Sequence, residues 1–386
     1  MRLVFLNLFR NKISTLLTMF GIAIAIFLFC ILETVLWSFT AGVEAADVSR
    51  LVVRHKESLV FPLPYSYVNK AKVDGVLSIS YGNWFGGVFE PDDKFFFAQF
   101  AIDMESYVPL YPEMKIPPED FQSVLKDRRG CILGQRLADR LKKKVGDTLV
   151  LKGGIYFSQD DGNNWEFTVR AIYTSDRPNF DQTIMFFHWN YLNEGWRAPE
   201  SQKNLVGYLV LKIDDPAKTA EISKAIDKKF STESERTLTM TEKAFNLEFV
   251  SMMGNLSLLI RFFGTVVVFT ILLLSINTNM MNARERIGEI GLLKALGFSP
   301  RYIFKLYLSE SLLLSFIGGL GGLAIAFLLI NIMGWNPKPT FFSLFSVQPT
   351  TLVIGVLLSL FTGLISGITP AIVSSRMSAS EALRSV

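Results

Sequence analysis

The chain has 386 residues and a mass of 43.5 kDa, with 50% hydrophobic and only 19% charged residues, so it is neither a disordered nor a fibrous protein. Its formal net charge is +4 at pH 7, and its mean hydropathy is +0.32. The apolar residues are concentrated in four long runs, which excludes a fully water-soluble protein.

The first apolar run and the basic residues before it predict a membrane anchor. Residues 1–12, which include Arg10 and Lys12, fit a short amphipathic helix on the cytoplasmic membrane surface. No charge occurs over residues 13–32, whereas the apolar region of a signal peptide has only about 7 to 15 residues. We therefore favour an uncleaved signal anchor at residues 13–39 over a cleaved signal peptide.

The segment behind this anchor, residues 40–250, is predicted to be a large extracytoplasmic α+β domain, because strand and helix patterns alternate along it. Predicted strands are residues 48–54, 94–101, 147–151, 165–172, 183–187 and 206–213; predicted helices are residues 65–72, 130–145 after a turn, and 216–230. The strand and helix of residues 48–72 recur at residues 206–230. We therefore expect two lobes, one of residues 45–128 with 200–245 and an inserted one of residues 129–199.

Three further apolar runs are long enough to cross a membrane. A helix of about 20 residues, rising 1.5 Å per residue, spans a hydrocarbon core that is about 30 Å thick. The runs predict transmembrane helices at residues 256–281, 306–333 and 352–373. Helices buried in a large globular core are the alternative, but their apolar runs are shorter and interrupted by polar faces.

Basic residues set the expected orientation in the membrane. Lysine and arginine collect in residues 1–12, in the loop 282–305 and in the tail 374–386, whereas the short extracytoplasmic loop 334–351 contains only Lys338. The positive-inside rule therefore places both termini in the cytoplasm and the α+β domain outside. That domain holds 27 basic and 30 acidic residues, so the positive net charge reflects topology and predicts no nucleic-acid partner.

The residue pattern indicates neither a catalytic nor a metal site. The chain has no G-x-x-x-x-G-K-[ST] phosphate-binding loop, so we expect that it does not hydrolyse ATP by itself. Its two histidines, His55 and His188, are far apart in the sequence, which disfavours a zinc site or a histidine-dependent hydrolase. Carboxylate pairs at residues 92–93 and 160–161 are interpreted as solvated turns rather than acid–base sites.

The cytoplasmic loop at residues 282–305 is predicted to contain an amphipathic helix. Four apolar residues recur there at helical spacing: Ile287, Ile290, Leu293 and Leu296. Gly297, with Pro300 beyond it, is a helix stop signal. Such a helix can bind a partner protein or rest in the lipid headgroups, and this pattern alone favours the headgroups.

Small residues at four-residue spacing predict close helix packing in the last two spans. The pairs are Gly318 with Gly322 and Gly363 with Gly367, which we interpret as packing positions rather than substrate contacts. The ionisable residues Glu33 and Glu310 are predicted to lie near the ends of their spans, where a structural role is favoured over a proton relay.

Several motifs resemble those of one membrane protein family. They are Glu285-Arg-Ile-Gly-Glu-Ile-Gly-Leu-Leu-Lys-Ala-Leu-Gly297, Ser309-Glu310-Ser-Leu-Leu-Leu, Gly318-Gly-Leu-Gly-Gly322, Pro370-Ala371 with Glu381-Ala-Leu-Arg384, and, in the outer segment, Ile132-Leu-Gly-Gln-Arg-Leu-Ala and Lys144-Val-Gly-Asp147. They are similar to the permease subunits of MacB/FtsX/LolC-type ABC transporters. The resemblance runs nearly end to end and is most specific in the carboxy-terminal half.

This resemblance implies a fold and a set of partners. The expected fold has four transmembrane helices and a MacB-like periplasmic core domain of two lobes, in a multi-pass protein of the bacterial inner membrane. The expected partners are a cytoplasmic ABC ATPase subunit, which supplies the ATP and Mg chemistry, a second permease copy or paralogue in a dimer, a periplasmic adaptor or lipoprotein, and the lipid bilayer. The chain itself is expected to bind no cofactor and to be non-catalytic.

The resemblance also implies which loop residues couple the chain to its ATPase: Glu285, Arg286, Glu289 and Lys294. Gly288 stands where the family has an arginine before the glutamate, so the contact of that cation is lost or taken over by Arg286. The implied function is a permease that exports or extracts an amphiphilic cargo such as a lipid, lipoprotein, peptide or drug. The alternative is an FtsX-like mechanotransmission subunit that regulates a periplasmic enzyme or signalling partner.

Overall fold

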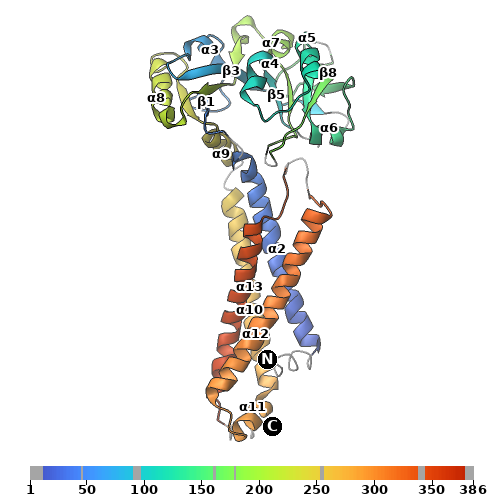
Figure 1. Ribbon diagram of the computed structural model, residues 1–386, viewed down its shortest axis with the longest axis vertical. Helices are drawn as coiled ribbons and strands as arrows, with labels where there is room; N and C mark the ends of the chain where they lie inside the picture. Colours follow the sequence, from blue (N-terminus) through green and yellow to red (C-terminus); the bar gives the residue numbers. More distant parts are fainter. Residues whose placement is uncertain are drawn as a thin grey trace. The chain divides into compact units, whose positions relative to one another are not determined.

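The computed structural model describes residues 12–44, 47–89, 97–159, 162–177, 180–252, 256–337 and 344–378. It divides into two compact units (Figure 1). The helical unit consists of Met1–Ser38, Asn255–Pro337 and Phe345–Val386; the sheet unit consists of Phe39–Gly254 and Lys338–Leu344. Several predicted features lie outside the described residues: the amphipathic segment before Lys12, the carboxylate pairs 92–93 and 160–161, Lys338, and the tail from residue 379.

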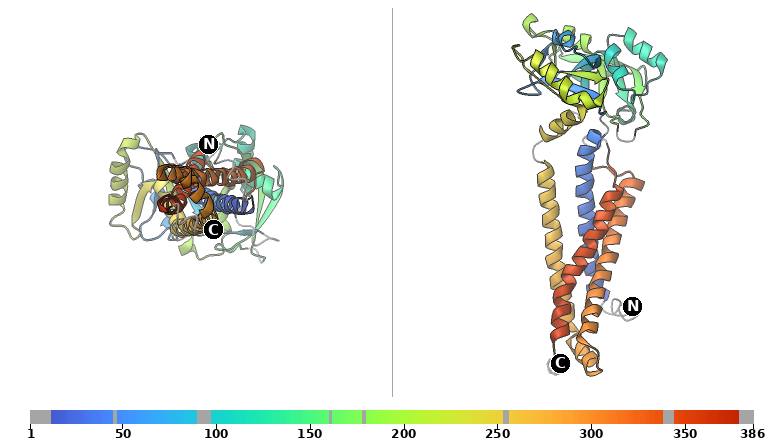
Figure 2. Two further views of the ribbon diagram at one scale, coloured as in Figure 1. Left: turned by 90° about the horizontal axis from the view of Figure 1, so that it is seen from below. Right: turned by 60° about the vertical axis from the view of Figure 1, so that its left-hand side comes forward.

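Four long helices form the helical unit, which confirms the prediction of four spans. They are α2 (Lys12–Glu44), α10 (Leu256–Glu285), α12 (Pro300–Phe327), which continues as a π-helical turn at Leu328–Ile332, and α13 (Pro349–Arg376). Each is long and apolar enough to cross a membrane. A short helix, α11 (Ile287–Ala295), lies between α10 and α12, and α13 packs against both α12 and α10 (Figure 2).

The loop predicted at residues 282–305 is shorter in the structure. Helix α10 continues to Glu285, and α12 begins at Pro300 rather than at residue 306. The early start follows from local chemistry, because the Ser299 hydroxyl accepts a hydrogen bond from the Tyr302 amide at 3.3 Å and proline is favoured in the first helical turn. Gly297 has a φ of +89°, which glycine adopts without strain after a helix end.

Glycines and hydroxyl groups allow α12 and α13 to approach closely. A Cβ atom at Gly363 would lie 3.0 Å from the Ser311 carbonyl oxygen, and one at Gly367 would lie 2.7 Å from the Ser311 Cβ. The Ser311 hydroxyl donates to the Gly363 carbonyl at 2.9 Å, and the Asn279 amide of α10 donates to Ser311 Oγ at 3.0 Å and to Ser366 Oγ at 3.1 Å. Small residues and interhelical hydrogen bonds therefore join three helices at one level.

The other predicted glycine pair faces α2. A Cβ at Gly318 would lie 2.8 Å from the Met19 carbonyl oxygen, and a Cβ at Gly322 would collide with the carbonyl oxygen of Ala23. Both neighbours are backbone atoms, which cannot rotate away as a flexible side chain can. The close approach of α2 to α12 therefore depends on residues without a side chain.

Gly322→Ala is expected to lower the melting temperature of the detergent-purified protein, because the new methyl group has no space beside Ala23. Overpacking of this kind costs about 1–3 kcal/mol. Gly321→Ala is the matched control, since an added Cβ there meets no atom within 4 Å. Equal melting temperatures for the two variants would contradict the contact between α2 and α12.

Within the described residues, the sheet unit is built on one mixed sheet with the strand order β12-β1-β11-β3-β5-β9-β6-β8-β7-β4 (Figure 1). The strands are β1 (Arg50–His55), β3 (Val76–Trp84), β4 (Val88–Phe89), β5 (Gln99–Ile102), β6 (Gly130–Gly134), β7 (Thr148–Lys152), β8 (Asn164–Tyr173), β9 (Met185–His188), β11 (Tyr208–Ile213) and β12 (Thr237–Thr241). A small second sheet pairs β2 (Leu63–Pro64) with β10 (Leu205–Val206). The pairs β5–β9 and β6–β8 are parallel, and the other pairs of the large sheet are antiparallel.

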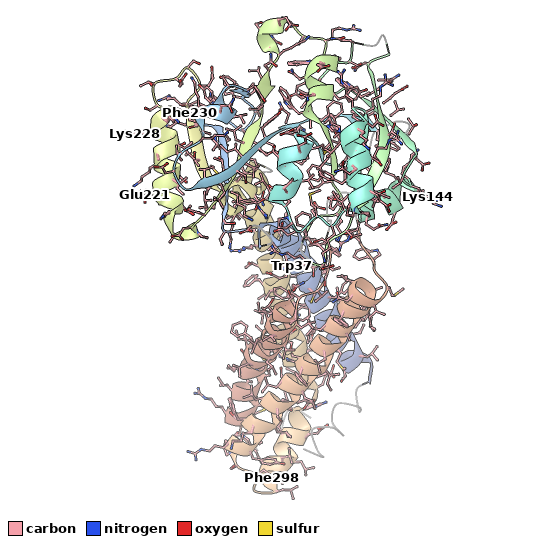
Figure 3. The ribbon with its side chains drawn as sticks, turned by 45° about the horizontal axis from the view of Figure 1, so that its top comes forward. Trp37, Lys144, Glu221, Lys228, Phe230 and Phe298 are labelled. Carbon is pink, nitrogen blue, oxygen red and sulfur yellow. The ribbon has the colours of Figure 1, made fainter. Side chains whose placement is uncertain are left out.

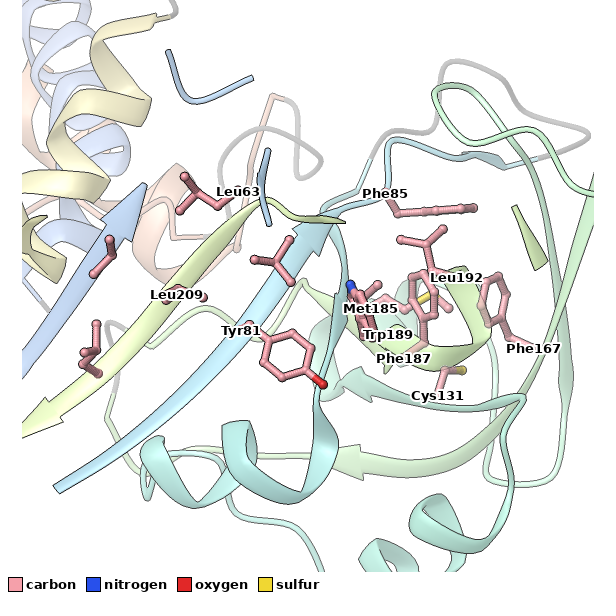
Figure 4. Packing of buried hydrophobic residues seen from close by; sticks show 14 of the residues in the cluster. Leu63, Tyr81, Phe85, Cys131, Phe167, Met185, Phe187, Trp189, Leu192 and Leu209 are labelled. Carbon is pink, nitrogen blue, oxygen red and sulfur yellow. The ribbon is translucent and has the colours of Figure 1, made fainter. Parts of the chain in front are cut away.

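Both faces of the large sheet are covered by helices. On one face lie α3 (Tyr67–Lys70), α6 (Gln135–Leu141), α7 (Trp189–Gly195) and α8 (Thr219–Lys229); on the other lie α4 (Met104–Tyr107), the 3₁₀ turn Val108–Leu110, α5 (Pro118–Lys126) and α9 (Glu242–Met252). Successive residues of a strand point to opposite faces of the sheet and so to different hydrophobic cores. On β11, Leu209 and Leu211 face the first core, and Val210 faces the second. Aromatic rings fill the first core, where Phe85, Phe187 and Trp189 lie together (Figure 4).

The structure confirms the α+β prediction. Apart from β4, the strands of each predicted lobe lie next to one another in the large sheet. Strands from residues 45–128 and 200–245 form the run from β12 to β5, and strands from residues 129–199 form the run from β9 to β7. One sheet therefore runs through both groups, and β4 of the first group pairs with β7 of the second. The turn and helix predicted at residues 130–145 are wrong for the first five residues, which form the buried strand β6.

Candidate functional site

The turn between α10 and α12 carries an exposed apolar surface. Leu292 of α11 is 58% exposed and Leu296, the residue after this helix, is 68% exposed; Phe298 and Tyr302 follow at 39% and 37%. The rings of Phe298 and Tyr302 lie 4.9 Å apart, and Phe298 lies at the end of the helical unit (Figure 3). We call these four residues the α11 patch. Large apolar side chains on an exposed turn are typical of a surface that contacts another protein or the membrane.

Helix α11 presents this patch because its opposite face is buried. Ile290 and Gly291 are buried, and Ile287 and Lys294 lie on the same side at helical spacing. The predicted stripe of Ile287, Ile290, Leu293 and Leu296 does not coincide with this buried face. An α-helix has 3.6 residues per turn, so each step of three residues falls about 60° short of a full turn and the stripe winds around the helix. Leu296, the last residue of that stripe, is therefore exposed rather than buried.

A nearly buried ion pair fixes the amino-terminal end of α11. Arg286 lies at the break between α10 and α11, and its Nη1 donates to Glu310 Oε1 at 2.8 Å and to Oε2 at 3.0 Å. The two side chains are only 9% and 12% exposed. Because Glu310 belongs to α12, this charge-assisted contact joins the α10–α11 break to the neighbouring helix.

A second contact fixes the carboxy-terminal end of α11. The Lys294 amine donates to the carbonyl oxygen of Ser375 at 2.8 Å and also to that of Met377. These oxygens belong to the last turn of α13 and the residue after it, where a helix leaves carbonyl groups unpaired and carries partial negative charge. The short helix is therefore held to α12 at one end and to α13 at the other.

The four predicted coupling residues thus occupy different positions. Arg286 and Lys294 are engaged inside the helical unit, Glu285 is exposed at the end of α10, and Glu289 is half-buried in the first turn of α11. Sequence reasoning favoured a structural role for Glu310 but did not predict its pairing with Arg286, and it did not predict the exposure of Leu292 and Leu296. Two signals pointed to them: a carboxylate inside a membrane span, and the i, i+4 spacing of Leu292 and Leu296.

A groove of about 560 Å³ lies between α2 and α10 in the helical unit. Most of its lining is apolar, with hydroxyl groups from Thr18, Ser275 and Thr278 and with Glu285 at one end. No group of three His, Cys, Asp or Glu side chains in the described part of the chain could hold a metal ion. The groove is lined mainly by apolar side chains of α2 and α10.

Two protein families match this chain, one over its amino-terminal part and the other over its carboxy-terminal part. Residues 15–229 match the family model of the MacB-like periplasmic core domain, and residues 261–379 match that of the FtsX-like permease C-terminal domain. The first match alone includes more than half of the chain.

Similar proteins span different parts of the chain. The uncharacterized ABC transporter permease MJ1507 of Methanocaldococcus jannaschii is 25% identical over 98% of this chain and 96% of its own length. The pyoverdine export ATP-binding/permease protein PvdT of Pseudomonas fluorescens is 26% identical over 46% of this chain, which matches only 27% of PvdT. The extracellular domain of the noncanonic ABC-type transporter YknZ from Gram-positive bacteria aligns over 50% of this chain and all of that domain, with a TM-score of 0.34 and 13% identity.

Proposed function

Because this chain belongs to the ABC transporter permeases that join a MacB-like periplasmic core domain to an FtsX-like C-terminal domain, we propose that it couples ATP hydrolysis by a separate ATPase subunit to movement of its sheet unit. In this proposal ATP and Mg are bound by the ATPase and not by the chain itself. The α11 patch is the observation that carries the proposal, because it offers the ATPase an exposed apolar surface on a firmly held helix.

The way in which α11 is held supports a mechanical role. An ATPase can bias the permease only through contacts that differ between its own two states. A displacement applied to the α11 patch is passed to α12 through the Arg286–Glu310 pair and to α13 through Lys294. Arg286 and Lys294 then act as positioning residues for the docking helix, while the patch and Glu289 contact the ATPase.

For the topology we propose both termini in the cytoplasm and the sheet unit on the outer side of a cytoplasmic membrane, in a dimer with a second permease. The α11 turn then faces the compartment that contains ATP. The basic residues Arg284, Arg301 and Lys305 flank this turn, which agrees with the positive-inside rule.

The proposed cargo is an amphiphilic molecule such as a lipid, lipoprotein, peptide or drug. The groove between α2 and α10 supports this choice, because it combines an apolar lining with a few hydroxyl groups and a carboxylate at one end. The second candidate is mechanical regulation of an outer enzyme or signalling partner. It is favoured if no ligand binds the groove while the sheet unit still responds to ATP.

Purification of the full chain in lipid nanodiscs tests the proposal. An ABC ATPase is expected to co-purify, and its rate of ATP hydrolysis is expected to depend on the presence of the chain. A chain that neither retains such an ATPase nor changes its activity would overturn the proposed function.

Glu289→Lys is expected to reduce the chain-dependent ATPase activity by about tenfold, which corresponds to a loss of about 1.4 kcal/mol at the contact. The charge reversal lies in the first turn of α11, beside the proposed docking surface. Glu221→Lys is the matched control, because Glu221 is also an acidic residue in the first turn of a helix but lies on α8 of the sheet unit (Figure 3). Equal activities of the two variants would count against a role of Glu289 in coupling.

A further inference from the structure

Two arginines of β1 attach helix α9 to the sheet. Arg54 Nε donates to Glu248 Oε2 at 2.9 Å, and its Nη2 pairs with Glu248 Oε1, so the contact is bidentate. Arg50 Nε donates to Glu242 Oε2 at 2.7 Å. Between these two ion pairs, Phe245 of α9 packs 5.8 Å from the ring of Tyr208.

The spacing of these residues matches the two elements. Arg50 and Arg54 lie four residues apart on β1, so both point to the sheet face that also carries Val52. Glu242, Phe245 and Glu248 succeed one another at intervals of three residues along one side of α9. The helix is therefore attached from Glu242 to Glu248, with an ion pair on each side of an aromatic contact.

Arg50 extends the attachment into the rest of the unit. The side chain is 1% exposed, and its Nη1 and Nη2 atoms donate to the Glu113 carboxylate at 3.1 Å. Its guanidinium lies 4.3 Å from the centroid of the Tyr111 ring. Burial alone would lower the pKa of Arg50, but the hydrogen bonds to Glu113 and the charge of Glu242 outweigh it and raise the pKa above the ordinary arginine value.

The attachment also joins the chain that follows α2 to the start of α9. After α2, Asp47 is the first described residue, and its amide donates to Glu242 Oε2 at 3.1 Å. Glu242 is the first residue of α9, the last helix before α10. The same carboxylate therefore binds the incoming chain and Arg50, and β1 is hydrogen-bonded to β12 on one side and to β11 on the other.

Ion pairs of this kind contribute more to the orientation of α9 on the sheet than to the free energy of unfolding. A buried pair usually adds little net stability compared with apolar residues of the same volume, because both charges lose their hydration. The planar arginine fork, in contrast, restricts the orientation of a carboxylate more tightly than an apolar contact does. Phe245 of α9 would still pack on Tyr208 of β11 without either pair, whereas the two pairs supply side-chain hydrogen bonds that join α9 to β1.

We propose that the Arg54–Glu248 and Arg50–Glu242 pairs are the attachment through which a displacement of α9 is passed to β1 and so to the whole sheet. This inference rests on the proposed function, because it assigns the residues that carry the ATP-driven movement into the sheet unit. Arg50, Arg54, Glu242 and Glu248 are accordingly positioning residues. The Arg54–Glu248 pair is the better target for a test, since Glu248 is 34% exposed and a glutamine there keeps an oxygen that can accept from Arg54, which also donates to the carbonyl oxygens of His55 and Lys56.

Glu248→Gln tests the attachment in the full chain, purified with the ATPase that co-purifies with it. The measurement is the ATP-dependent change in hydrogen exchange of the β1 and β11 amides, divided by the rate of ATP hydrolysis. We expect Glu248→Gln to keep the hydrolysis rate but to lose at least half of the exchange response. Its melting temperature is expected to fall, because the buried Arg54 loses its charged partner. Glu233→Gln is the matched control: Glu233 pairs with Lys70 at 2.7 Å and is 35% exposed, but it lies away from α9.

The possible outcomes separate the two proposals. A wild-type chain whose sheet does not respond to ATP would overturn the proposed function together with this inference. A responding wild type with an equal response in Glu248→Gln would overturn only the attachment. If Glu248→Gln does not fold, Arg54→Lys decides, because it keeps the positive charge and removes the bidentate contact; a full response in that variant would also overturn the attachment.

Discussion

Replacing Leu292 and Leu296 together with aspartate is expected to abolish ATPase binding while the permease stays folded. The two side chains are 58% and 68% exposed, so the free chain loses little packing. In the complex, however, two carboxylates would have to lose their hydration inside an apolar contact. With about 2 kcal/mol for each residue of a binding hot spot, the dissociation constant should rise about 1,000-fold.

Binding of the purified ATPase to the nanodisc-embedded chain measures this effect directly. Leu77→Asp combined with Val60→Asp is the matched control, because these side chains are 65% and 75% exposed and lie on the sheet unit. The control should bind the ATPase like the wild type. Wild-type affinity in the Leu292 and Leu296 variant would exclude the α11 patch as the docking surface.

The single variants Arg286→Met and Glu310→Met are each expected to destabilise the protein by about 3–5 kcal/mol, because each leaves the other charge buried without its partner. The double variant is expected to regain most of this loss, since methionine fills similar volume and neither charge remains. This comparison distinguishes a specific ion pair from a general sensitivity of the two positions.

Thermal unfolding of the detergent-purified variants measures the coupling between the two residues. Additive losses in the double variant would mean that Arg286 and Glu310 do not act as a pair.

The double variant also tests the coupling to the ATPase, because α11 would keep its fold but lose one of its two attachments. Its chain-dependent ATPase activity should fall even where its melting temperature is restored.

The membrane helices could be predicted from sequence because apolar run length is a local property that a bilayer imposes directly. Their ends were less predictable. Helix α12 begins at Pro300 because Ser299 caps it, and this capping signal lies within a loop whose basic residues suggested a longer connection. Run length identifies the span, while capping chemistry determines where the helix starts.

Strands of the sheet unit were predictable where their side chains alternate. Strand β8, for example, alternates buried and exposed residues over most of its length. Strand β6 was not predicted, because Cys131, Ile132 and Leu133 form a short apolar run between two glycines. All three residues are buried, and such a run is equally compatible with a helix segment. Strand β3 was not predicted, because serine, glycine and asparagine interrupt its apolar pattern.

The position of α11 in the sequence was predictable, but its rotation about its own axis was not. The periodic run after Glu285 indicated a helix, but the rotation of α11 depends on contacts between residues far apart in the chain. Arg286 and Glu310 are 24 positions apart, and Lys294 and Ser375 are 81 positions apart. Such pairs form only when the long helices pack, so one sequence cannot indicate which side of α11 remains exposed.

The hydrogen bond from the Asp47 amide to Glu242 joins the chain that follows α2 to the first residue of α9, the last helix before α10. A domain whose ends adjoin can be spliced into a host chain, or removed from it, without stretching the host at the junction. The segment between Asp47 and Glu242 therefore meets the geometric condition for exchange with another domain whose own ends adjoin.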